Sequence, residues 1–301
     1  MPLRSASEWQ HARSFHHSRF APELLRGRSE RISVCLPARE CAATVGAIVE
    51  ALAVLREQGL IDEIVVVDAD STDGTAEVAR LAGATVHRES TLRPELGPVL
   101  GKGDAIWRAL SVLEGEIVCF IDADAEGFSP HYVTGLVGPL VELEAVEFVK
   151  AYYRRPFRVG ELELTEGGGR VNHLMARPAL AIFYPELAGI HQPLAGEVAA
   201  RRRLLERIPI ATGYGLEVGM LLDAWEAVGL EGLAQVDLDV HHNRHQPLAA
   251  LSSMAYEVLH VIAQRLERDG RLSGFEPGPL LAREPREVAA PHMRPPIASI
   301  R

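Results

Sequence analysis

Cysteine is scarce in this chain of 301 residues. The three cysteines, Cys35, Cys41 and Cys119, lie in or beside apolar runs typical of buried strands. So small a number argues against a disulfide framework and favours buried, reduced thiols. We therefore expect a protein of the reducing cytoplasm.

Long apolar runs are also missing. No stretch of about 18 uninterrupted apolar residues occurs, and residues 1–31 are rich in Arg, His and Ser without an apolar core segment. These absences argue against a membrane-spanning helix and a secretory signal. We therefore expect a protein that is neither exported nor bound to a membrane.

Positive charge is in deficit. The formal net charge is −10 and the pI is about 5.7, which argues against broad binding to nucleic acid or to an anionic membrane. A local basic pocket could still hold a small anion. With 47% hydrophobic and 24% charged residues, the composition is that of a globular protein with one large core or two modest ones.

Two common nucleotide-binding fingerprints are absent. No Gly-x-Gly-x-x-Gly follows the first predicted strand, and no Gly-x-x-x-x-Gly-Lys-Ser/Thr occurs anywhere. The sequence therefore excludes a Rossmann dinucleotide fingerprint and a P-loop. A nucleotide, if one binds, is held differently.

The first half of the chain alternates strand and helix patterns. Strands are predicted at residues 32–36, 63–68, 84–87 and 116–121, and helices at 43–57, 73–82 and 103–113. The apolar character of the strands is typical of parallel strands that are covered on both faces. This pattern predicts an α/β protein with a doubly wound, mostly parallel sheet.

Pairs of aspartates stand at the ends of two predicted strands. Asp68 and Asp70 end the second strand, and Asp122 and Asp124 end the fourth. Ligands of such sheets bind at the carboxyl ends of the strands, and two carboxylates at i and i+2 suit Mg²⁺ or Mn²⁺. We therefore predict a site for a metal and a diphosphate at Asp122 and Asp124. The alternative is that one aspartate caps the following helix while the other is solvated.

Lysine is nearly absent, since Lys102 and Lys150 are the only two. Lys102 lies in "GKGDA" between two glycines, which let backbone approach a ligand closely. A compact ammonium suits a phosphate or a base as a point charge. The alternative is a flexible, solvated loop before a helix.

Eight motifs in order carry a family resemblance over residues 30–270. They are "CLPA" (35–38), "VVVDADSTDGT" (65–75), "GKGDAIWRAL" (101–110), "FIDADAEGFSP" (120–130), "YYRRPF" (152–157), "GGGRVNHLMARP" (167–178), "QPLAGE" (192–197) and "GYGLEVGMLLD" (213–223). The set resembles the glucosyl- and mannosyl-3-phosphoglycerate synthases.

This resemblance implies a GT-A fold with a smaller C-terminal acceptor lobe. It also implies a metal-dependent retaining glycosyltransferase that moves a hexose from a nucleoside-diphosphate sugar to the 2-hydroxyl of D-3-phosphoglycerate. Retention suggests attack from the leaving-group face or, as the alternative, double displacement. A homodimer is expected from the family.

The resemblance assigns roles to individual residues. Asp122 and Asp124 match the metal-binding Asp-x-Asp motif, and Tyr214 and Glu217 match a segment that lines the sugar pocket. We assign catalytic roles to Asp124, Lys102 and Glu217, although a carboxylate near a helix N-terminus such as Glu217 is also ordinary on a protein surface. The expected contacts of the nucleotide sugar are Pro37, Ala38, Arg39, Cys41, Asp68, Asp70, Lys102, Asp122, Ala123, Asp124, Leu194 and Tyr214.

The "GGGR" motif matches the loop that holds the acceptor's phosphate and carboxylate. Its expected contacts are Gly168, Gly169, Arg170, Val171 and Asn172. A glycine-rich stretch that opens a helix offers free N–H groups, the positive end of the helix dipole and a guanidinium fork. These groups suit a small phosphorylated acid, and the alternative is a flexible turn.

The sequence departs from the family pattern in two places. "PARECAAT" has Arg39 where family members commonly have Asn or Glu, and "VHHNRHQPL" (240–248) aligns Asn243 with a metal-binding histidine of the family. We expect His242 or His245 to supply that ligand, since imidazole binds divalent metals beside carboxylates. The alternative is that these histidines only cap the helix at 248–269.

The identity of the donor follows from resemblance alone. "PARECAAT" and the pair Ala69 and Asp70, where glucosyl members often have Ser-Gly, favour the mannosyl branch with GDP-mannose. Glucosyl transfer from UDP-glucose is an alternative, as is an inverting transferase acting on a lipid phosphate or a polysaccharide. A nucleotidyltransferase or a non-catalytic sensor of sugar nucleotides is a third class.

The predicted organisation has four parts. Residues 1–30 form an N-terminal arm, 31–150 the α/β half that binds the nucleotide sugar, 151–270 the half for acceptor binding and dimerisation, and 271–301 an irregular tail rich in proline.

Overall fold

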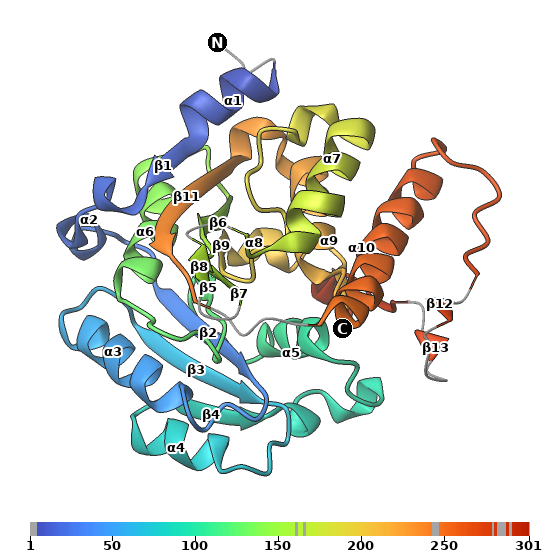
Figure 1. Cartoon of the computed structure of the whole chain (residues 1–301). Coiled ribbons are helices and arrows are strands. Elements are labelled where there is room, and N and C mark those ends of the chain that lie inside the picture. Colours follow the sequence, from blue (N-terminus) through green and yellow to red (C-terminus); the bar gives the residue numbers. More distant parts are fainter. Residues whose placement is uncertain are drawn as a thin grey trace.

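An eight-stranded sheet forms the centre of the computed structural model, which describes residues 5–159, 162–164, 167–242, 247–278, 280–281, 287–288 and 291–300 (Figure 1). Its strands lie in the order β1-β11-β6-β9-β5-β2-β3-β4. Neighbouring strands in the sheet are parallel except where β9 pairs with β5 and with β6. The mostly parallel sheet predicted from the sequence is therefore confirmed. The strands of the sheet are β1 (Ser14–His16), β2 (Ile32–Ala38), β3 (Glu63–Asp68), β4 (Thr85–Arg88), β5 (Ile117–Phe120), β6 (Phe148–Arg154), β9 (Val198–Arg201) and β11 (Leu233–Val240).

The four predicted strands are present as β2 to β5, with bounds within two residues of those expected. The apolar character of β2, β3 and β5 reflects burial on both faces, because alternate residues of a strand point to opposite sides, whereas β4 is a partly exposed edge strand. In β3, Val65 and Val67 belong to one core cluster while Ile64 and Val66 belong to the other. The sheet thus separates two apolar cores.

Helices cover both faces of the sheet. Residues of α3, α4 and α6 pack in the core with Ile64, and residues of α5, α9 and α10 pack in the core with Val65. The helices are α1 (Ala6–Arg13), α2 (Pro22–Arg26), α3 (Val45–Glu57), α4 (Thr75–Leu81), α5 (Lys102–Ala109), α6 (His131–Glu142), α7 (Arg177–Phe183), α8 (Arg202–Leu205), α9 (Leu216–Val228) and α10 (Leu248–Arg268). Of the helices in the described ranges, none combines the length and apolarity needed to cross a bilayer.

Short elements complete the described chain. The 3₁₀ turns are η1 (His17–Arg19), η2 (Glu89–Thr91), η3 (Pro94–Leu96), η5 (Pro185–Leu187), η6 (Leu230–Gly232) and η7 (Ile297–Ser299), and η4 (Asn172–Ala176) is a π-helical turn. The small antiparallel pairs are β7 (Phe157–Val159) with β8 (Leu162–Leu164), β10 (Ile210–Ala211) with β14 (Met293–Arg294), and β12 (Leu280–Leu281) with β13 (Glu287–Val288).

The described part of the predicted N-terminal arm is built into the sheet. Its strand β1 pairs in parallel with β11 at the sheet edge. Trp9 of α1 is fully buried, and its indole N–H donates to the carbonyl oxygen of Leu230 at 2.9 Å. Burying this large aromatic side chain explains why the segment packs against the body of the protein rather than extending from it.

The predicted irregular tail is also anchored where it is described. Arg294 of β14 forms an ion pair with Asp104 of α5 at 2.7 Å, and the indole N–H of Trp107 donates to the carbonyl oxygen of Pro295 at 2.8 Å. Residues 291–300 therefore lie along the helix that begins at Lys102, although their sequence has no periodic pattern.

The sheet runs through both predicted halves of the chain. The boundary expected at residues 150–151 falls inside β6, and β11 from the second half lies beside β6. Residues 31–150 and 151–270 therefore share one sheet. That the first range binds the nucleotide sugar and the second binds the acceptor stays a prediction.

Candidate active site

A cavity of about 680 Å³ opens at the carboxyl ends of β2, β3 and β5. This is where a doubly wound sheet places its ligands. Most of the residues expected to contact the nucleotide sugar line this cavity: Pro37, Ala38, Arg39, Cys41, Asp70, Lys102, Asp122, Ala123, Asp124 and Tyr214. Glu217 lines it as well, whereas Asp68 and Leu194 do not.

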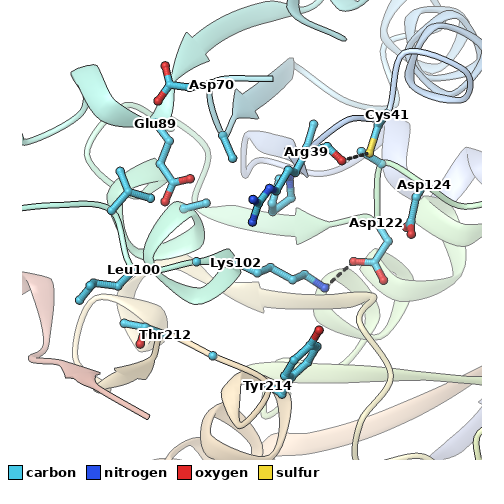
Figure 2. A pocket seen from close by; sticks show the side chains of 18 of the residues that line it. Arg39, Cys41, Asp70, Glu89, Leu100, Lys102, Asp122, Asp124, Thr212 and Tyr214 are labelled. Carbon is cyan, nitrogen blue, oxygen red and sulfur yellow. Dashed lines mark hydrogen bonds and ion pairs between the residues drawn. The ribbon is translucent and has the colours of Figure 1, made fainter. Parts of the chain in front are cut away.

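Lys102 contacts side chains from two other motifs that are far from it in the sequence. It is the first residue of α5, and its Nζ lies 2.5 Å from Oδ1 of Asp122 (Figure 2) and 3.3 Å from Oε1 of Glu217. Asp122 follows β5, and Glu217 lies in the first turn of α9. The sequence predicted each of these residues separately, and the structure brings them together around one ammonium group.

The charges of this cluster reinforce one another. Burial would lower the pKa of Lys102, but the negative charges of Asp122 and Glu217 outweigh it and raise that pKa above its usual range. Burial would likewise raise the pKa of Asp122, but Lys102 holds it below its usual value. Lys102 is thus a stable cation in the pocket.

The two lysines differ sharply. Lys102 has 37% of its side chain exposed to the pocket, whereas Lys150 of β6 is buried and donates from Nζ to the carbonyl oxygen of Ala195. Burial lowers the pKa of Lys150 to about 8. Lys150 therefore acts as a structural donor beneath the loop that precedes β9.

Asp124 is available for a cation. It is exposed, and loss of water around its carboxylate together with the negative charge of Asp122 raises its pKa. A divalent cation would relieve this repulsion, and two carboxylates are suitable hard oxygen donors. The side chains of Asp122 and Asp124 therefore fit a site for Mg²⁺ or Mn²⁺.

Gly196 shapes the position of the Asp122 carboxylate. A Cβ atom at residue 196 would overlap Oδ2 and the rest of that carboxylate. Only glycine therefore lets the segment before β9 pass this close to Asp122. We did not assign Gly196 a role from the sequence, although it belongs to the "QPLAGE" motif.

The loop after β2 forms another wall of the pocket. The N–H of Cys41 donates to Oγ1 of Thr75 at 2.8 Å, and its Sγ donates to the carbonyl oxygen of Arg39 at 3.1 Å. Glu40 adopts a positive φ of 52° and accepts from the N–H of Thr72 through Oε1. The loop is tied to the start of α4, which leaves the exposed Arg39 side chain directed into the pocket (Figure 2).

The two aspartates after β3 have different surroundings. Asp68 is buried, and its Oδ2 accepts from the N–H of Ser71 at 3.2 Å, which shapes the turn after the strand. Asp70 lines the pocket with a positive φ of 54°, and its Oδ1 accepts from Ser90 at 3.0 Å. A direct contact between Asp68 and a nucleotide stays a prediction, since this side chain lies outside the pocket lining.

The predicted acceptor loop packs against Arg155. The N–H of Gly168 donates to the carbonyl oxygen of Arg155 at 3.1 Å, so the expectation of a free N–H at this glycine is wrong. A Cβ at residue 168 would crowd the side chain of Arg155, and Gly169 has a positive φ of 67°. The glycines are thus required by close packing and by backbone conformation.

The rest of the acceptor loop leads into a helix. Arg170 is half-buried, while Val171 and Asn172 are buried. Oδ1 of Asn172 accepts from the N–H of Leu194 at 2.9 Å, which fastens the loop to the "QPLAGE" segment. Both Asn172 and Leu194 therefore have a structural bond, and their contacts with substrates stay predictions.

The histidines near residue 242 differ in burial. His242 is exposed, and a backbone bridge with Glu126 places it beside the segment that follows Asp124. His241 is buried, with Nδ1 at 3.2 Å from the hydroxyl of Tyr132 and Nε2 at 3.8 Å from Oε1 of Glu197. His245 lies outside the described residues, so the choice between His242 and His245 as a metal ligand stays a prediction.

Within the described ranges, one group of three side chains has the spacing of a metal site, and it lies elsewhere. His16, His17 and Asp239 meet at the ends of β1 and β11. The N–H of Ser18 donates to Nδ1 of His16, so its Nε2 carries the proton and donates to Asp239 at 3.3 Å. In the absence of a metal this arrangement is a hydrogen-bonded cluster, and a metal would have to displace the ring protons that hold it together.

Two acidic residues of the pocket wall were missed in the sequence. Glu89 follows β4, and Glu257 of α10 accepts from the N–H of Tyr214 at 2.7 Å through Oε2. Burial raises the pKa of Glu257 and, with the charge of Asp104, the pKa of Glu89 to about 8. Neither residue belongs to a motif, and both reach the pocket only through the tertiary fold.

Sequence comparison gives consistent matches. Residues 33–195, more than half of the chain, match the model of glycosyl transferase family 2. A glucosyl-3-phosphoglycerate synthase from Petrotoga mobilis is 41% identical over 267 residues, covering 86% of this chain and 82% of that protein. The same enzyme from Mycolicibacterium smegmatis is 44% identical over 234 residues, covering 78% and 77%.

Solved structures agree with these matches. Mannosyl-3-phosphoglycerate synthase from Rubrobacter xylanophilus superimposes with a TM-score of 0.91 at 44% identity, and each chain is covered completely. Glucosyl-3-phosphoglycerate synthase from Mycobacterium tuberculosis, in complex with Mn²⁺, UDP-glucose and phosphoglyceric acid, gives a TM-score of 0.80 at 36% identity, covering 100% of this chain and 97% of that one. The GT-A fold expected from the sequence is confirmed.

Proposed function

Because the chain belongs to the family of glucosyl- and mannosyl-3-phosphoglycerate synthases, we propose that this hexosyltransferase moves mannose or glucose from a nucleoside-diphosphate sugar to the 2-hydroxyl of D-3-phosphoglycerate. We favour GDP-mannose as the donor and keep UDP-glucose as the second candidate. The observation that carries the proposal is the contact of Lys102 with both Asp122 and Glu217, in a pocket of about 680 Å³.

The reaction exchanges one bond at the anomeric carbon for another. The bond from that carbon to the leaving phosphate oxygen breaks, and a bond to the acceptor oxygen forms on the same face. The departing diphosphate can take the proton of the acceptor hydroxyl, so no strong protein base is needed. Double displacement stays the alternative.

The residues of the pocket divide the remaining work. Lys102 places a permanent positive charge beside the leaving diphosphate, which stabilises the charge that develops there. Glu217 would bind hydroxyl groups of the sugar, and Arg170 with the loop at Gly168 and Gly169 would orient the acceptor. Orientation of the two substrates accounts for much of the rate in such a reaction.

A divalent cation is part of the proposal. Asp122 and Asp124 would hold Mg²⁺ or Mn²⁺, with His242 or His245 as a further ligand, and the bound ion would neutralise the diphosphate. The support within this chain is the exposed carboxylate of Asp124, whose pKa is raised beside Asp122.

A homodimer is also proposed. Large apolar side chains are exposed on the described faces of η4, α7 and α10, namely Leu174, Ile182, Phe183 and Leu259. Such a surface is suited to association with a second copy. Light scattering of the purified protein tests this, and a monomer at micromolar concentration would contradict it.

The buried, free Cys35, Cys41 and Cys119 are consistent with a reducing cytoplasm, which we propose as the location.

The decisive experiment is a transfer assay. Purified protein with Mg²⁺ and D-3-phosphoglycerate is given GDP-mannose, UDP-glucose or GDP-glucose, and both nucleoside diphosphate release and product mass are followed. We expect release that depends on phosphoglycerate and a hexosyl-phosphoglycerate product. If a donor binds with metal but no transfer occurs, the acceptor assignment at Arg170 is wrong.

A further inference from the structure

Glu89 is a buried acid in the wall of the pocket. It is the first residue of η2, directly after β4, and its exposed fraction is 1%. Its Oε1 is buried and has no hydrogen-bond partner among the described residues. An unpaired polar atom in such a place costs free energy, so a ligand that supplies a donor would be favoured there when the side chain turns toward the pocket on binding.

Glu89 lies at the opposite end of the pocket from Asp124. The diphosphate belongs beside Lys102, Asp122 and Asp124, where the positive charge and the metal ligands are. Figure 2 shows Glu89 and Asp70 at the opposite side of the pocket from Asp124. A nucleotide whose diphosphate lies at Lys102 would therefore extend its base toward Glu89.

Charged groups from three other elements act on Glu89. Burial and then the charge of Asp104 raise its pKa to about 8, with a smaller contribution from Asp70, while Arg108 and Arg39 act to lower it. Asp104 is itself paired with Arg108 at 3.0 Å and with Arg294 at 2.7 Å. The guanidinium of Arg39 faces Glu89 across the pocket, and no ion pair joins them (Figure 2).

We propose that Glu89 selects the nucleobase of the donor by accepting hydrogen bonds from N1–H and N2–H₂ of guanine. This inference rests on the proposed function and deepens it, because it names the donor class as a guanosine diphosphate sugar. Guanine presents two neighbouring donors that match the two oxygens of a carboxylate. Uracil presents a single N–H flanked by two carbonyl oxygens, so it offers the ionised carboxylate one donor instead of two.

The neutral form of Glu89 has a measurable consequence. Hydrogen bonds to the ionised form of an acid stabilise that form, so guanine binding lowers the pKa of Glu89. Below its pKa in the free protein, the binding of GDP therefore releases a proton from Glu89 to the solvent. UDP, which offers no matching pair of donors, releases none from this residue.

Calorimetry of GDP and UDP with Mg²⁺ tests the proposal without requiring turnover. Titrations at about one pH unit below the pKa of Glu89, in two buffers of different ionisation enthalpy, give both the Kd and the protons released. The variants are E89Q, E89D and the exposed control E95Q. We expect wild-type protein to bind GDP more tightly than UDP. In E89Q the ratio of the two affinities should fall about 5- to 150-fold, which is the discrimination that one bidentate hydrogen-bonded pair provides.

The outcomes separate the inference from the proposed function. Selective GDP binding with proton release that E89Q abolishes supports the inference, even if no hexose is transferred to phosphoglycerate. An unchanged ratio of GDP to UDP affinity in E89Q overturns it, and so does an equal loss for both nucleotides. We expect E89D to keep the proton release but lose part of the preference, because its carboxylate is withdrawn by one methylene.

Discussion

The two ends of the pocket differ in whether their charged side chains form ion pairs. At the end proposed for the metal, Lys102 of α5 is paired with Asp122, which follows β5, and with Glu217 of α9. At the other end, Glu89 and Arg39 face each other without an ion pair, and the Glu89 carboxyl is buried without a partner for Oε1. In our proposal the paired charges serve every donor, whereas the unpaired acid discriminates among nucleobases.

The largest effect should come from breaking the paired end. In D122N, Lys102 loses its nearer carboxylate and the proposed metal site loses one ligand, so we expect kcat/KM to fall about 10²- to 10³-fold or more for every donor. Steady-state rates with each nucleotide sugar measure this. The exposed variant E95Q is the control, and near-normal turnover of D122N would refute the role of this motif.

A smaller effect should follow from displacing Asp122 while keeping its charge. In G196A the new methyl group overlaps the Asp122 carboxylate, so we expect activity to fall about 10- to 10²-fold and the free energy of unfolding to fall by about 1–3 kcal/mol. Gly278 is the matched control, because a Cβ there meets nothing within 4 Å. If G196A and G278A behave alike, the contact with Asp122 does not matter.

The unpaired end can be examined through stability and pH. The pKa of Glu89 is raised to about 8 in the folded protein, so the native state binds more protons than the unfolded state between its ordinary value of 4.5 and that pKa. The stability that the protonated Glu89 contributes, relative to E89Q, is therefore fully present below pH 4.5 and is lost as the pH rises to about 8, a loss of about 4–5 kcal/mol. Urea unfolding of both proteins across this range measures the difference, and a pH-independent difference would contradict the burial of a neutral acid.

The smallest effect should come from removing the ion pair that joins the tail to Asp104 of α5. In R294M the buried Asp104 loses one of its two arginines, and we expect a loss of about 1–3 kcal/mol in stability with activity changed less than about threefold. The control is R80M, which removes only an exposed pair with Glu77. Equal unfolding midpoints for the two variants would show that the tail contributes little to this wall.

The same contrast explains how much of the site could be predicted. The Asp-x-Asp motif and Lys102 follow local patterns, because a buried strand that ends in carboxylates and a glycine-flanked lysine are visible within ten residues. The contact of Lys102 with Glu217 joins residues far apart in sequence and depends on how α9 packs. Glu89 belongs to no motif, and the charged groups that act on it, such as Asp104 and Arg39, are distant from it in the sequence.

The fold shows a similar limit. The apolar runs predicted β2, β3 and β5 because each of these strands is buried on both faces, whereas β4 is a partly exposed edge strand. They gave no sign that β9 runs antiparallel between β5 and β6, or that β1 and β14 pair with strands more than eighty residues away. Such pairings depend on the partner strand, and a local pattern does not contain that information.

The scarcity of lysine has a chemical consequence for the whole molecule. An amine reacts with an acylating agent or a reducing sugar only when it is both uncharged and accessible. Lys102 is accessible but held in its charged form by Asp122 and Glu217, and Lys150 is closer to losing its charge but is buried. The folded protein should therefore resist acetylation and glycation at both lysine side chains, and labelling of either one would report that the structure around it had opened.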